Sequence, residues 1–275
     1  MDITVKSKIP PISLISFDLD GTLLNQEHEV SGRSREAITR LKDNGYKLLV
    51  TTGRTLPETR NVCDGIAFDG YICSNGMVIY ENDFTLIHME IIPGYAVIEI
   101  LNQLKRAKIN YELHDENGEL YVIEEDEDFL KKRIDRVRMI PQKELFYNIL
   151  SKKINIVKFL ILTIHNNIII PEHLQVDTLP VNLIIVNQHN VEINKAGINK
   201  WIGLQYYLKR FCLPADQILA FGDGANDMEI LKRSGWSVAM ENAGQEVKRE
   251  AKDITLSNDN DGVAFYIENN ILNYT

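Results

Sequence analysis

Two acidic motifs, each directly after a short apolar segment, constrain the fold of this chain most strongly. Residues 12–17 (ISLISF) run into DLDGT, and residues 217–221 (QILAF) run into GDGANDMEI. An apolar segment of this length that ends in a polar loop is typical of a buried strand. Both motifs are therefore expected where a strand leaves a sheet.

Strands and helices are predicted to alternate in both the first and the last part of the chain. A helix is expected over residues 31–44, with apolar side chains at helical spacing behind Ser31 as its N-cap. Further strands are predicted over residues 46–50, 71–73, 236–240 and 253–256. Such alternation predicts an α/β fold with a Rossmann-like parallel sheet, whose ligand sites lie at the carboxyl ends of its strands.

Residues 85–191 follow a different pattern, which predicts an inserted domain. They contain no strand-end acidic motif, and at about 107 residues they have the usual size of one domain. The elements expected there are a helix, a hairpin, a charged helix and two more strands, over residues 96–108, 110–124, 128 onward, 156–163 and 181–186. We therefore expect a discontinuous core of residues 1–84 and 192–275 with an inserted α+β domain of residues 85–191.

Charge and cysteine content exclude several classes of protein. The net charge of −9 repels nucleic-acid phosphates, so no nucleic-acid partner is expected. The N-terminal residues lack a secretory pattern and no apolar run approaches the ~20 residues that span a bilayer, so we expect a cytoplasmic protein without a membrane partner. The three cysteines (Cys63, Cys73 and Cys212) form no CxxC pair and predict buried structural thiols rather than disulfides or a zinc site.

The acidic motifs predict a metal site. Asp18 and Asp20 lie two residues apart where a strand ends, so both can turn toward one side. A hard divalent cation such as Mg²⁺ relieves their repulsion, because it takes one or two carboxylates together with phosphate oxygens. If the two strands are neighbours, Asp223 joins this pair around the ion, with Asp227 as a further ligand or an orienting group. In the alternative, the first pair caps a turn and Asp227 caps the next helix.

TTGR, which follows the strand over residues 46–50, predicts phosphate binding. A Thr hydroxyl and a Gly amide at a strand end, with a helix expected near Pro57, are suited to donating hydrogen bonds to phosphate oxygens. A positive charge is expected from Lys195 or Lys200, since both lie close to a predicted helix start. In the alternative, TTGR is only a turn and both lysines lie on the surface.

Together these motifs resemble those of the haloacid dehalogenase (HAD) superfamily of phosphohydrolases. In chain order they are DLDGT, TTGR, a lysine after GIN, and GDGANDMEI. Residues 74–76 (SNG), EINKAGINK and VAMENAGQEVK resemble the Cof-type branch of that superfamily. The resemblance covers residues 14–265 apart from the insert, and it implies a HAD-like core whose insert is a cap domain that covers the phosphate site.

The resemblance assigns roles to the carboxylates. Asp18 matches the nucleophile, which forms an aspartyl-phosphate, and Asp20 matches the general acid and base. Mg²⁺ would be held by the Asp18 side chain, the Asp20 backbone carbonyl and Asp223, with Asp227 as the remaining member of the metal site.

The phosphate-binding residues follow in the same way. Thr52 and Gly53 match the phosphate-binding pair of the second motif, and Asn226 matches a further phosphate contact. Aligning EIN with the branch's EIxPxGVSK selects Lys200 over Lys195. The chain departs from the family pattern after this lysine, where Trp201 replaces the usual Gly.

The activity implied by the resemblance is Mg²⁺-dependent hydrolysis of a small phosphorylated metabolite: a sugar phosphate, a nucleotide or a phosphorylated cofactor. Tyr111, His114 and residues 187–190 of the insert are candidates to face the substrate. A phosphomutase on the same core and a phospho-ligand sensor without turnover stay open as alternatives. We expect a monomer or a weak homodimer.

Overall fold

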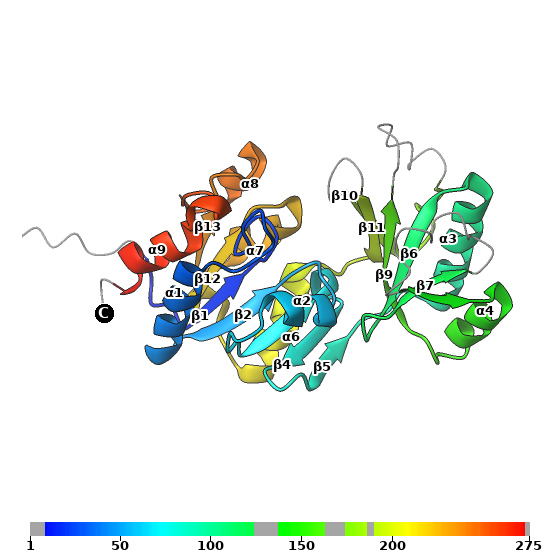
Figure 1. Cartoon of the computed structure of the whole chain (residues 1–275), viewed down its shortest axis with the longest axis horizontal. Helices are drawn as coiled ribbons and strands as arrows, with labels where there is room; N and C mark the ends of the chain where they lie inside the picture. The colour runs from blue at the N-terminus through cyan, green and yellow to red at the C-terminus, as the bar shows by residue number, and fades with distance from the viewer. Residues whose placement is uncertain (1–8, 124–136, 163–173, 186–189, 273–275) are drawn as a thin grey trace, which may run out of the picture. The chain divides into compact units, whose positions relative to one another are not determined.

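The strand that leads into DLDGT lies inside a sheet that has eight strands in the described part of the chain (Figure 1). The computed structural model describes residues 9–123, 137–162, 174–185 and 190–272. β1 (Leu14–Phe17) pairs in parallel with β2 (Lys47–Thr51) on one side and with β12 (Ile218–Gly222) on the other. The two acidic motifs therefore leave neighbouring strands at the same edge of the sheet.

The remaining strands extend this sheet outward in the order β14-β13-β12-β1-β2-β3-β4-β5. Their bounds are β3 (Gly70–Cys73), β4 (Val78–Glu81), β5 (Leu86–Met89), β13 (Trp236–Ala239) and β14 (Asp253–Ile254). Every pair from β14 to β3 is parallel, and β4 runs antiparallel to β3. The parallel α/β sheet expected from the sequence is confirmed.

Helices cover both faces of this sheet. On one face Phe221 of β12 contacts Tyr266 of α9 (Gly262–Asn270), which packs against α1 (Gly32–Asp43). On the other face Leu14 and Leu49 join a core cluster with α6 (Lys200–Phe211) and α7 (Met228–Arg233). The shorter helices of this part are α2 (Leu56–Val62) and α8 (Gln245–Glu250). Because the central strands are buried on both faces, they appear in the sequence as continuous apolar runs.

The expected N-cap of the first helix is present. The Ser31 hydroxyl accepts a hydrogen bond from the backbone N–H of Ser34 at 3.1 Å, and α1 begins at the next residue, Gly32. This bond satisfies one of the amides that a helix start leaves without an intrahelical partner. Within the described ranges, no helix is long and apolar enough to cross a membrane.

A second, mostly antiparallel sheet is built from the inserted residues. In the described ranges its order is β10-β11-β9-β6-β7-β8, and only the β7–β8 pair is parallel. Its strands are β6 (Asn110–Asp115), β7 (Leu120–Ile123), β8 (Val137–Ile140), β9 (Ile156–Leu162), β10 (Val181–Ile185) and β11 (Asn190–Lys195). Its helices α3 (Gly94–Ala107) and α4 (Gln142–Leu150) pack against each other. This is the α+β architecture expected for the insert.

The chain divides into two compact units. The first comprises residues 1–54, 58–88 and 199–275, and the second comprises residues 55–57 and 89–198. Residues 190–195 lie in the second sheet because β11 pairs with β9 and β10. The domain bounds 85 and 191 expected from the sequence stay a prediction. The charged helix expected from residue 128 onward begins outside the described residues.

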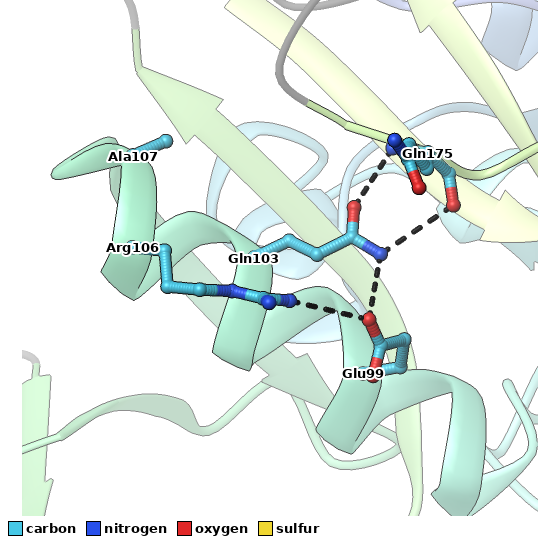
Figure 2. A pocket seen from close by; sticks show the side chains of 5 residues that line it. All are labelled: Glu99, Gln103, Arg106, Ala107 and Gln175. Atoms are coloured by element: carbon cyan, nitrogen blue, oxygen red, sulfur yellow. Dashed lines mark hydrogen bonds and ion pairs between the residues drawn. The ribbon is translucent and has the colours of Figure 1, made fainter.

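Gln103 of α3 fixes the segment around Gln175 onto the helix (Figure 2). Its Oε1 accepts a hydrogen bond from the Gln175 amide at 2.8 Å, and its Nε2 donates to Glu99 Oε1 at 2.9 Å. Arg106 donates to the same Glu99 oxygen at 3.4 Å. These polar groups form hydrogen bonds with one another and attach the segment around Gln175 to α3. We therefore interpret the pocket that they line as a structural feature and not as a ligand site.

Candidate active site

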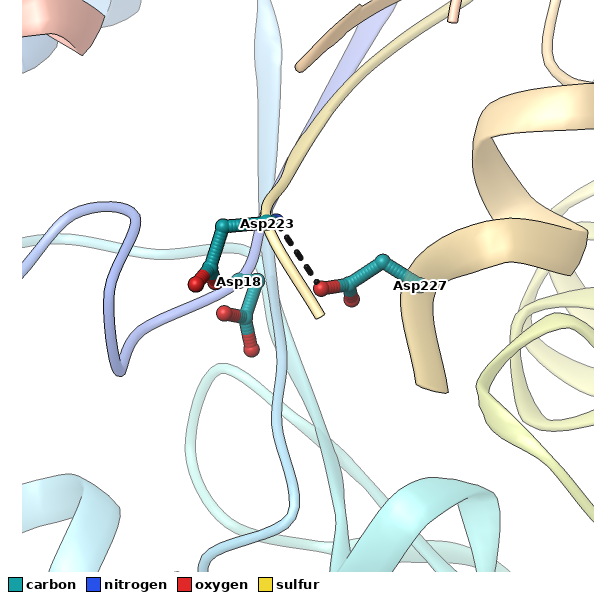
Figure 3. A group of neighbouring side chains, drawn as sticks. All are labelled: Asp18, Asp223 and Asp227. Carbon is teal, nitrogen blue, oxygen red and sulfur yellow. Dashed lines mark hydrogen bonds between the residues drawn. The ribbon is translucent and has the colours of Figure 1, made fainter. Parts of the chain in front are cut away.

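The two acidic motifs meet at the carboxyl ends of β1 and β12. The Asp18 amide donates to the Phe221 carbonyl at 3.2 Å, which continues the parallel pairing of the two strands into the motifs. Asp18, Asp223 and Asp227 each bring a carboxylate oxygen within 4.8 Å of the others (Figure 3). Asp18 and Asp227 are 6% and 2% exposed. Three carboxylates from two distant parts of the sequence therefore lie close together, two of them buried and Asp223 partly exposed.

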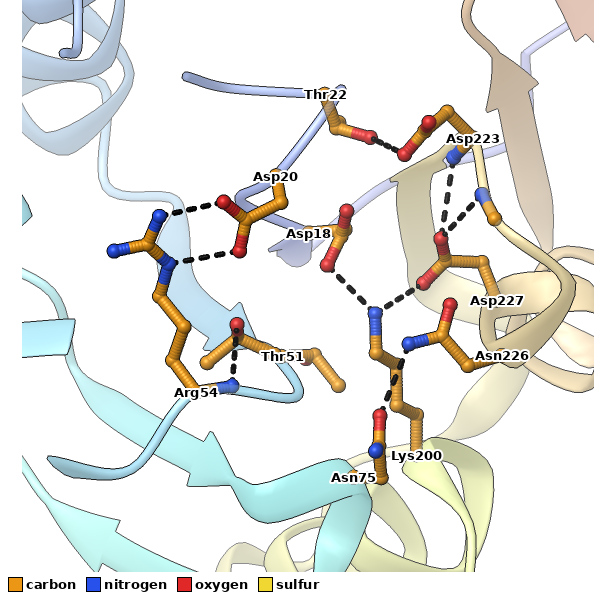
Figure 4. A network of polar contacts seen from close by, with 12 residues as sticks. Asp18, Asp20, Thr22, Thr51, Arg54, Asn75, Lys200, Asp223, Asn226 and Asp227 are labelled. Atoms are coloured by element: carbon orange, nitrogen blue, oxygen red, sulfur yellow. Dashed lines mark hydrogen bonds and ion pairs between the residues drawn. The ribbon is translucent and has the colours of Figure 1, made fainter. Parts of the chain in front are cut away.

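Lys200 supplies the positive charge inside this cluster. Its Nζ donates to Asp18 Oδ1 at 2.6 Å and to Asp227 Oδ1 at 2.7 Å (Figure 4). The lysine is the first residue of α6, and the Asn199 side chain caps that helix by accepting from the Ile202 amide at 2.9 Å. Trp201, the departure from the family pattern, is 7% exposed and belongs to the hydrophobic core cluster that includes Leu204 and Leu208 of the same helix.

Lys195 lies elsewhere. It ends β11 in the second unit and donates to Glu90 Oε2 at 2.5 Å. Of the two lysines that the sequence offered, only Lys200 contacts the acidic cluster.

Asp227 is a structural centre of its loop. Its Oδ2 accepts hydrogen bonds from the backbone amides of Asp223 at 3.1 Å and Gly224 at 3.0 Å. Its side chain makes no capping bond to α7, so the alternative in which this carboxylate only caps the next helix does not hold. The carboxylate instead ties the loop after β12 to Lys200.

Asp20 is placed differently from the other carboxylates. Its side chain is 49% exposed, and it does not belong to the cluster of Asp18, Asp223 and Asp227, whose carboxylate oxygens lie within 4.8 Å of one another. Arg54 donates two hydrogen bonds to the Asp20 carboxylate, Nε to Oδ2 at 2.7 Å and Nη2 to Oδ1 at 2.5 Å (Figure 4). Arg54 was not among the predicted site residues, although it is the last residue of TTGR. A signal existed, because a strand end beside β1 places its arginine near DLDGT.

Two further residues, which the sequence reasoning also missed, support Asp223. The Thr22 hydroxyl donates to Asp223 Oδ1 at 3.0 Å, and Asn242 Nδ2 donates to Asp223 Oδ2 at 3.4 Å and to the Gly21 carbonyl at 2.8 Å. Gly21 has φ +77°, and a Cβ there would overlap the Asp223 carboxylate. The glycine of DLDGT is therefore required by both its backbone conformation and the close approach of Asp223. Thr22 and Asn242 lie within quoted motifs, which was the available signal.

The predicted phosphate-binding residues lie along the neighbouring strand ends. The Thr52 amide donates to the Ile72 carbonyl at 2.8 Å, and the Thr52 hydroxyl accepts from the Arg54 amide at 3.1 Å. A hydroxyl that accepts one bond keeps its own proton for donation. Asn226 Nδ2 donates to Asn75 Oδ1 at 3.0 Å (Figure 4).

Burial and like charge together raise the pKa values of the cluster. The pKa of Asp18 lies well above its usual value because of burial and the neighbouring Asp227, although Lys200 opposes the shift. Burial and Asp227 raise the pKa of Asp223 to about 6. Burial alone would lower the pKa of Lys200, but Asp18 and Asp227 raise it above its usual value. Three carboxylates against one ammonium leave an excess of negative charge that favours a bound cation.

The candidate residues of the insert lie apart from this cluster in the chain. Tyr111 and His114 both lie on β6 and are buried. Residues 187–189 lie outside the described residues. Their expected contacts with a substrate stay predictions.

Comparison with known proteins is consistent across sequence and structure. The family model for haloacid dehalogenase-like hydrolases matches residues 15–267. The 5-amino-6-(5-phospho-D-ribitylamino)uracil phosphatase YcsE of Bacillus subtilis is 28% identical over 268 residues, which cover 95% of this chain and 96% of the relative. A haloacid dehalogenase-like hydrolase structure from B. subtilis matches with a TM-score of 0.80 at 25% identity, covering 94% of this chain and 99% of that one. The structure of a HAD/COF-like hydrolase from Plasmodium vivax matches with a TM-score of 0.83 at 23% identity, covering 96% of each chain.

Proposed function

Because this chain belongs to the haloacid dehalogenase-like hydrolases, in their Cof-type branch, and is a phosphatase, we propose that it hydrolyses a small phosphorylated metabolite through an aspartyl-phosphate on Asp18, with Mg²⁺ as cofactor. The observation that carries the proposal is the buried contact of Lys200 with Asp18 and Asp227, beside Asp223. A buried lysine beside three clustered carboxylates suits a site that holds a cation and a phosphoryl group together, because the excess negative charge favours the cation, and the cation and Lys200 then offset the charge of the phosphate.

Asp18 is proposed as the nucleophile. Its oxygen forms a bond to phosphorus while the bond from phosphorus to the ester oxygen breaks, so one difficult displacement becomes two easier ones. The hydrogen bond from Lys200 at 2.6 Å holds the carboxylate in one orientation, which lowers the cost of aligning it for attack.

Asp20 is proposed as the general acid and base. It protonates the departing alkoxide and then takes a proton from the water that attacks the aspartyl-phosphate, which releases phosphate and restores Asp18. Its half-exposed position suits exchange of this proton with solvent, and one of its two hydrogen bonds to Arg54 would have to open for that oxygen to carry the proton.

The donor set fits Mg²⁺. Asp18 and Asp223 offer hard carboxylate oxygens within 4.8 Å of each other, next to Asp227, and their raised pKa values reflect burial together with repulsion from Asp227, both of which a bound cation would offset. We propose that the Asp18 and Asp223 carboxylates and the Asp20 backbone carbonyl hold the ion, and that Asp227 completes the metal site. When bound, Mg²⁺ neutralises charge between the nucleophile and the phosphate and in the transition state.

Phosphate oxygens are proposed to bind Lys200, Thr52, Gly53 and Asn226. Lys200 brings a full positive charge, and the others bring hydroxyl or amide donors at neighbouring strand ends. For the substrate we propose a phosphomonoester of a small metabolite, since YcsE is named for a phosphate ester on a ribityl chain. Sugar phosphates, nucleotides and phosphorylated cofactors fall in this class. The cap role of the insert, the cytoplasmic location and the monomeric or weakly dimeric state stay predictions.

Hydrolysis of a generic aryl phosphate tests the proposal. We expect Mg²⁺-dependent release of phosphate by the wild type, loss of this activity with EDTA, and loss by at least ~100-fold in Asp18→Asn, because the amide is a poor nucleophile. Asp216→Asn is the matched control, since Asp216 is an exposed aspartate of the same unit, in the short 3-10 helix Ala215–Gln217 that precedes β12.

Activity that survives Asp18→Asn would exclude Asp18 as the nucleophile. A wild-type protein that is inactive on aryl phosphate and on a panel of phosphorylated metabolites would instead favour a phospho-ligand sensor. Isomerised products without net phosphate release would indicate a phosphomutase.

A further inference from the structure

The turn formed by Ser74, Asn75 and Gly76 has a backbone that few sequences can adopt. It follows β3 as a 3-10 turn, and its three residues have φ values of +49°, +56° and +95°. Positive φ is unfavourable for most side chains but is tolerated by Gly and comparatively well by Asn. Asn75 is 1% exposed, so its polar side chain is held inside the protein.

Asn75 contacts two of the proposed phosphate-binding segments. Its backbone amide donates to the Thr52 carbonyl at 2.9 Å, and its Oδ1 accepts from Asn226 Nδ2 at 3.0 Å (Figure 4). A Cβ built on Gly53 would lie 3.3 Å from the same Oδ1, so the Asn75 carboxamide rests against the glycine of TTGR. The side chain therefore sits between the second and fourth motifs.

The same turn also supports the start of the helix that carries Lys200. A Cβ on Gly76 would overlap the Asn199 carbonyl, and a Cβ on Gly203 would lie 2.6 Å from the Gly76 Cα. The turn and the first turn of α6 are thus packed backbone to backbone, which fixes the place of Asn75 relative to the site.

We propose that Asn75 is a positioning residue that orients the Asn226 carboxamide for phosphate binding. A carboxamide rotates readily and can present either its oxygen or its NH₂ group. With Asn75 Oδ1 as acceptor, one N–H of Asn226 is engaged and the other stays on the same side of the amide, available to a phosphate oxygen. A reversed amide would present an oxygen to the anion and repel it. This inference rests on the proposed function, in which Asn226 binds phosphate.

A double-mutant cycle between the two residues tests the inference. The variants are Asn75→Gly, Asn226→Ala and the double variant, compared by kcat/KM on aryl phosphate with Mg²⁺ and by inhibition with inorganic phosphate. We expect each single variant to lose about tenfold in kcat/KM, the size of one lost hydrogen bond. The double variant should lose no more than Asn226→Ala alone, and the inhibition constant of phosphate should rise by the same factor in all three.

Two further variants separate positioning from stability. Asn75→Asp keeps the acceptor oxygen and tolerates positive φ, although its added charge weakens phosphate binding; relative to Asn75→Asp alone, Asn226→Ala should therefore still cost about tenfold in that background. Cys212→Gly is the matched backbone control, because Cys212 also has positive φ (+53°) but lies exposed at the far end of α6. It should keep wild-type activity and melt at or above the wild-type midpoint, because glycine adopts positive φ without strain.

Losses that multiply to about a hundredfold in the double variant would overturn the inference, because Asn75 would then act independently of Asn226. If Asn75→Gly does not fold, the Asn75→Asp background tests the coupling instead, and loss of the Asn226→Ala effect in that background overturns the inference. A wild type without phosphatase activity would reject the proposed function instead.

Discussion

At the scale of single residues, the site contains more negative than positive charge. One ammonium, Lys200, faces the carboxylates of Asp18 and Asp227, with Asp223 beside them. Burial strengthens the repulsion that remains after this pairing. A substrate phosphate would add further negative charge, so binding of a cation and binding of phosphate are expected to favour each other.

The raised pKa of Asp223 makes the stability of the metal-free protein depend on pH. In the folded state the pKa of Asp223 is about 6, compared with the usual aspartate pKa of 3.8. Between these two pH values the folded state therefore binds more protons than the unfolded state. Its favourable contribution is therefore complete below the unfolded pKa and is lost as pH rises through about 6. At pH 7, Asp223→Asn should melt higher than the metal-free wild type, by about 2–4 °C for each kcal/mol gained in unfolding free energy. At pH 4 the two proteins should have the same midpoint.

Scanning calorimetry in EDTA at both pH values measures this difference. Added Mg²⁺ should raise the midpoint of the wild type at pH 7 and leave that of Asp223→Asn almost unchanged, because the variant lacks a proposed ligand. Asp253→Asn is a weaker comparison, since Asp253 accepts from Tyr266, so Asp216→Asn again serves as control. A variant that melts below the wild type at pH 7 would contradict the prediction.

Sequence motifs located the residues of the site better than they described the contacts between them. DLDGT and GDGANDMEI were expected to meet if their strands were neighbours, and β1 pairs with β12. The position of TTGR beside DLDGT indicated that Arg54 lies near Asp20, but the two hydrogen bonds between them could not be predicted, because they depend on side-chain conformations across two loops. The place of Asn75 depends on a turn with successive positive φ values, which a propensity for strand or helix does not report.

At the scale of elements, the close packing of the Ser74–Gly76 turn on α6 depends on glycine. A helical Gly→Ala change usually stabilises by about 1 kcal/mol. At Gly203, however, the added Cβ would lie 2.6 Å from the Gly76 Cα and 2.8 Å from Ile72 Cγ2. We therefore expect Gly203→Ala to lower the thermal midpoint and, by shifting the start of α6, to reduce kcat at least about tenfold.

Gly32→Ala is the matched control for this change. Gly32 is also helical, and nothing lies within 4 Å of a Cβ built on it. Its variant should melt at or above the wild-type midpoint and keep full activity. Thermal unfolding and steady-state kinetics of both variants check the prediction, and equal effects at the two glycines would refute it.

Elements of the first unit were easier to predict than those of the second. Buried strands of the parallel sheet are continuous apolar runs that end in recognisable motifs, as in β1 and β12. In β11, by contrast, Glu192 and Asn194 are buried beside Val191 and Ile193, so the strand lacks the exposed polar face that usually marks it. α4 was missed although Leu145 and Ile149 are buried at helical spacing, because a nine-residue segment offers few repeats of its pattern.

At the scale of the whole molecule, chemical probes are unevenly distributed between the two units. All three cysteines and both tryptophans lie in segments of the first unit. Thiol reactivity and tryptophan fluorescence therefore both report on the unit that carries the acidic cluster. Far-ultraviolet circular dichroism reports on both units, so a difference between these signals would show that the units unfold separately.

The thiols provide a direct measure of how the first unit opens. Cys63 and Cys73 are buried and Cys212 is exposed, and burial raises the pKa of Cys63 to about 12. Because the thiolate is the reactive form, an aromatic disulfide reagent at pH 8 should label one thiol in the native protein and three in denaturant. Cys212→Ser should reduce native labelling to none. The two buried thiols should become reactive over the same denaturant range in which tryptophan fluorescence changes, since both need the unit to unfold. Labelling of a second thiol under native conditions, before any change in fluorescence, would show that the sheet opens locally beside Cys63 or Cys73.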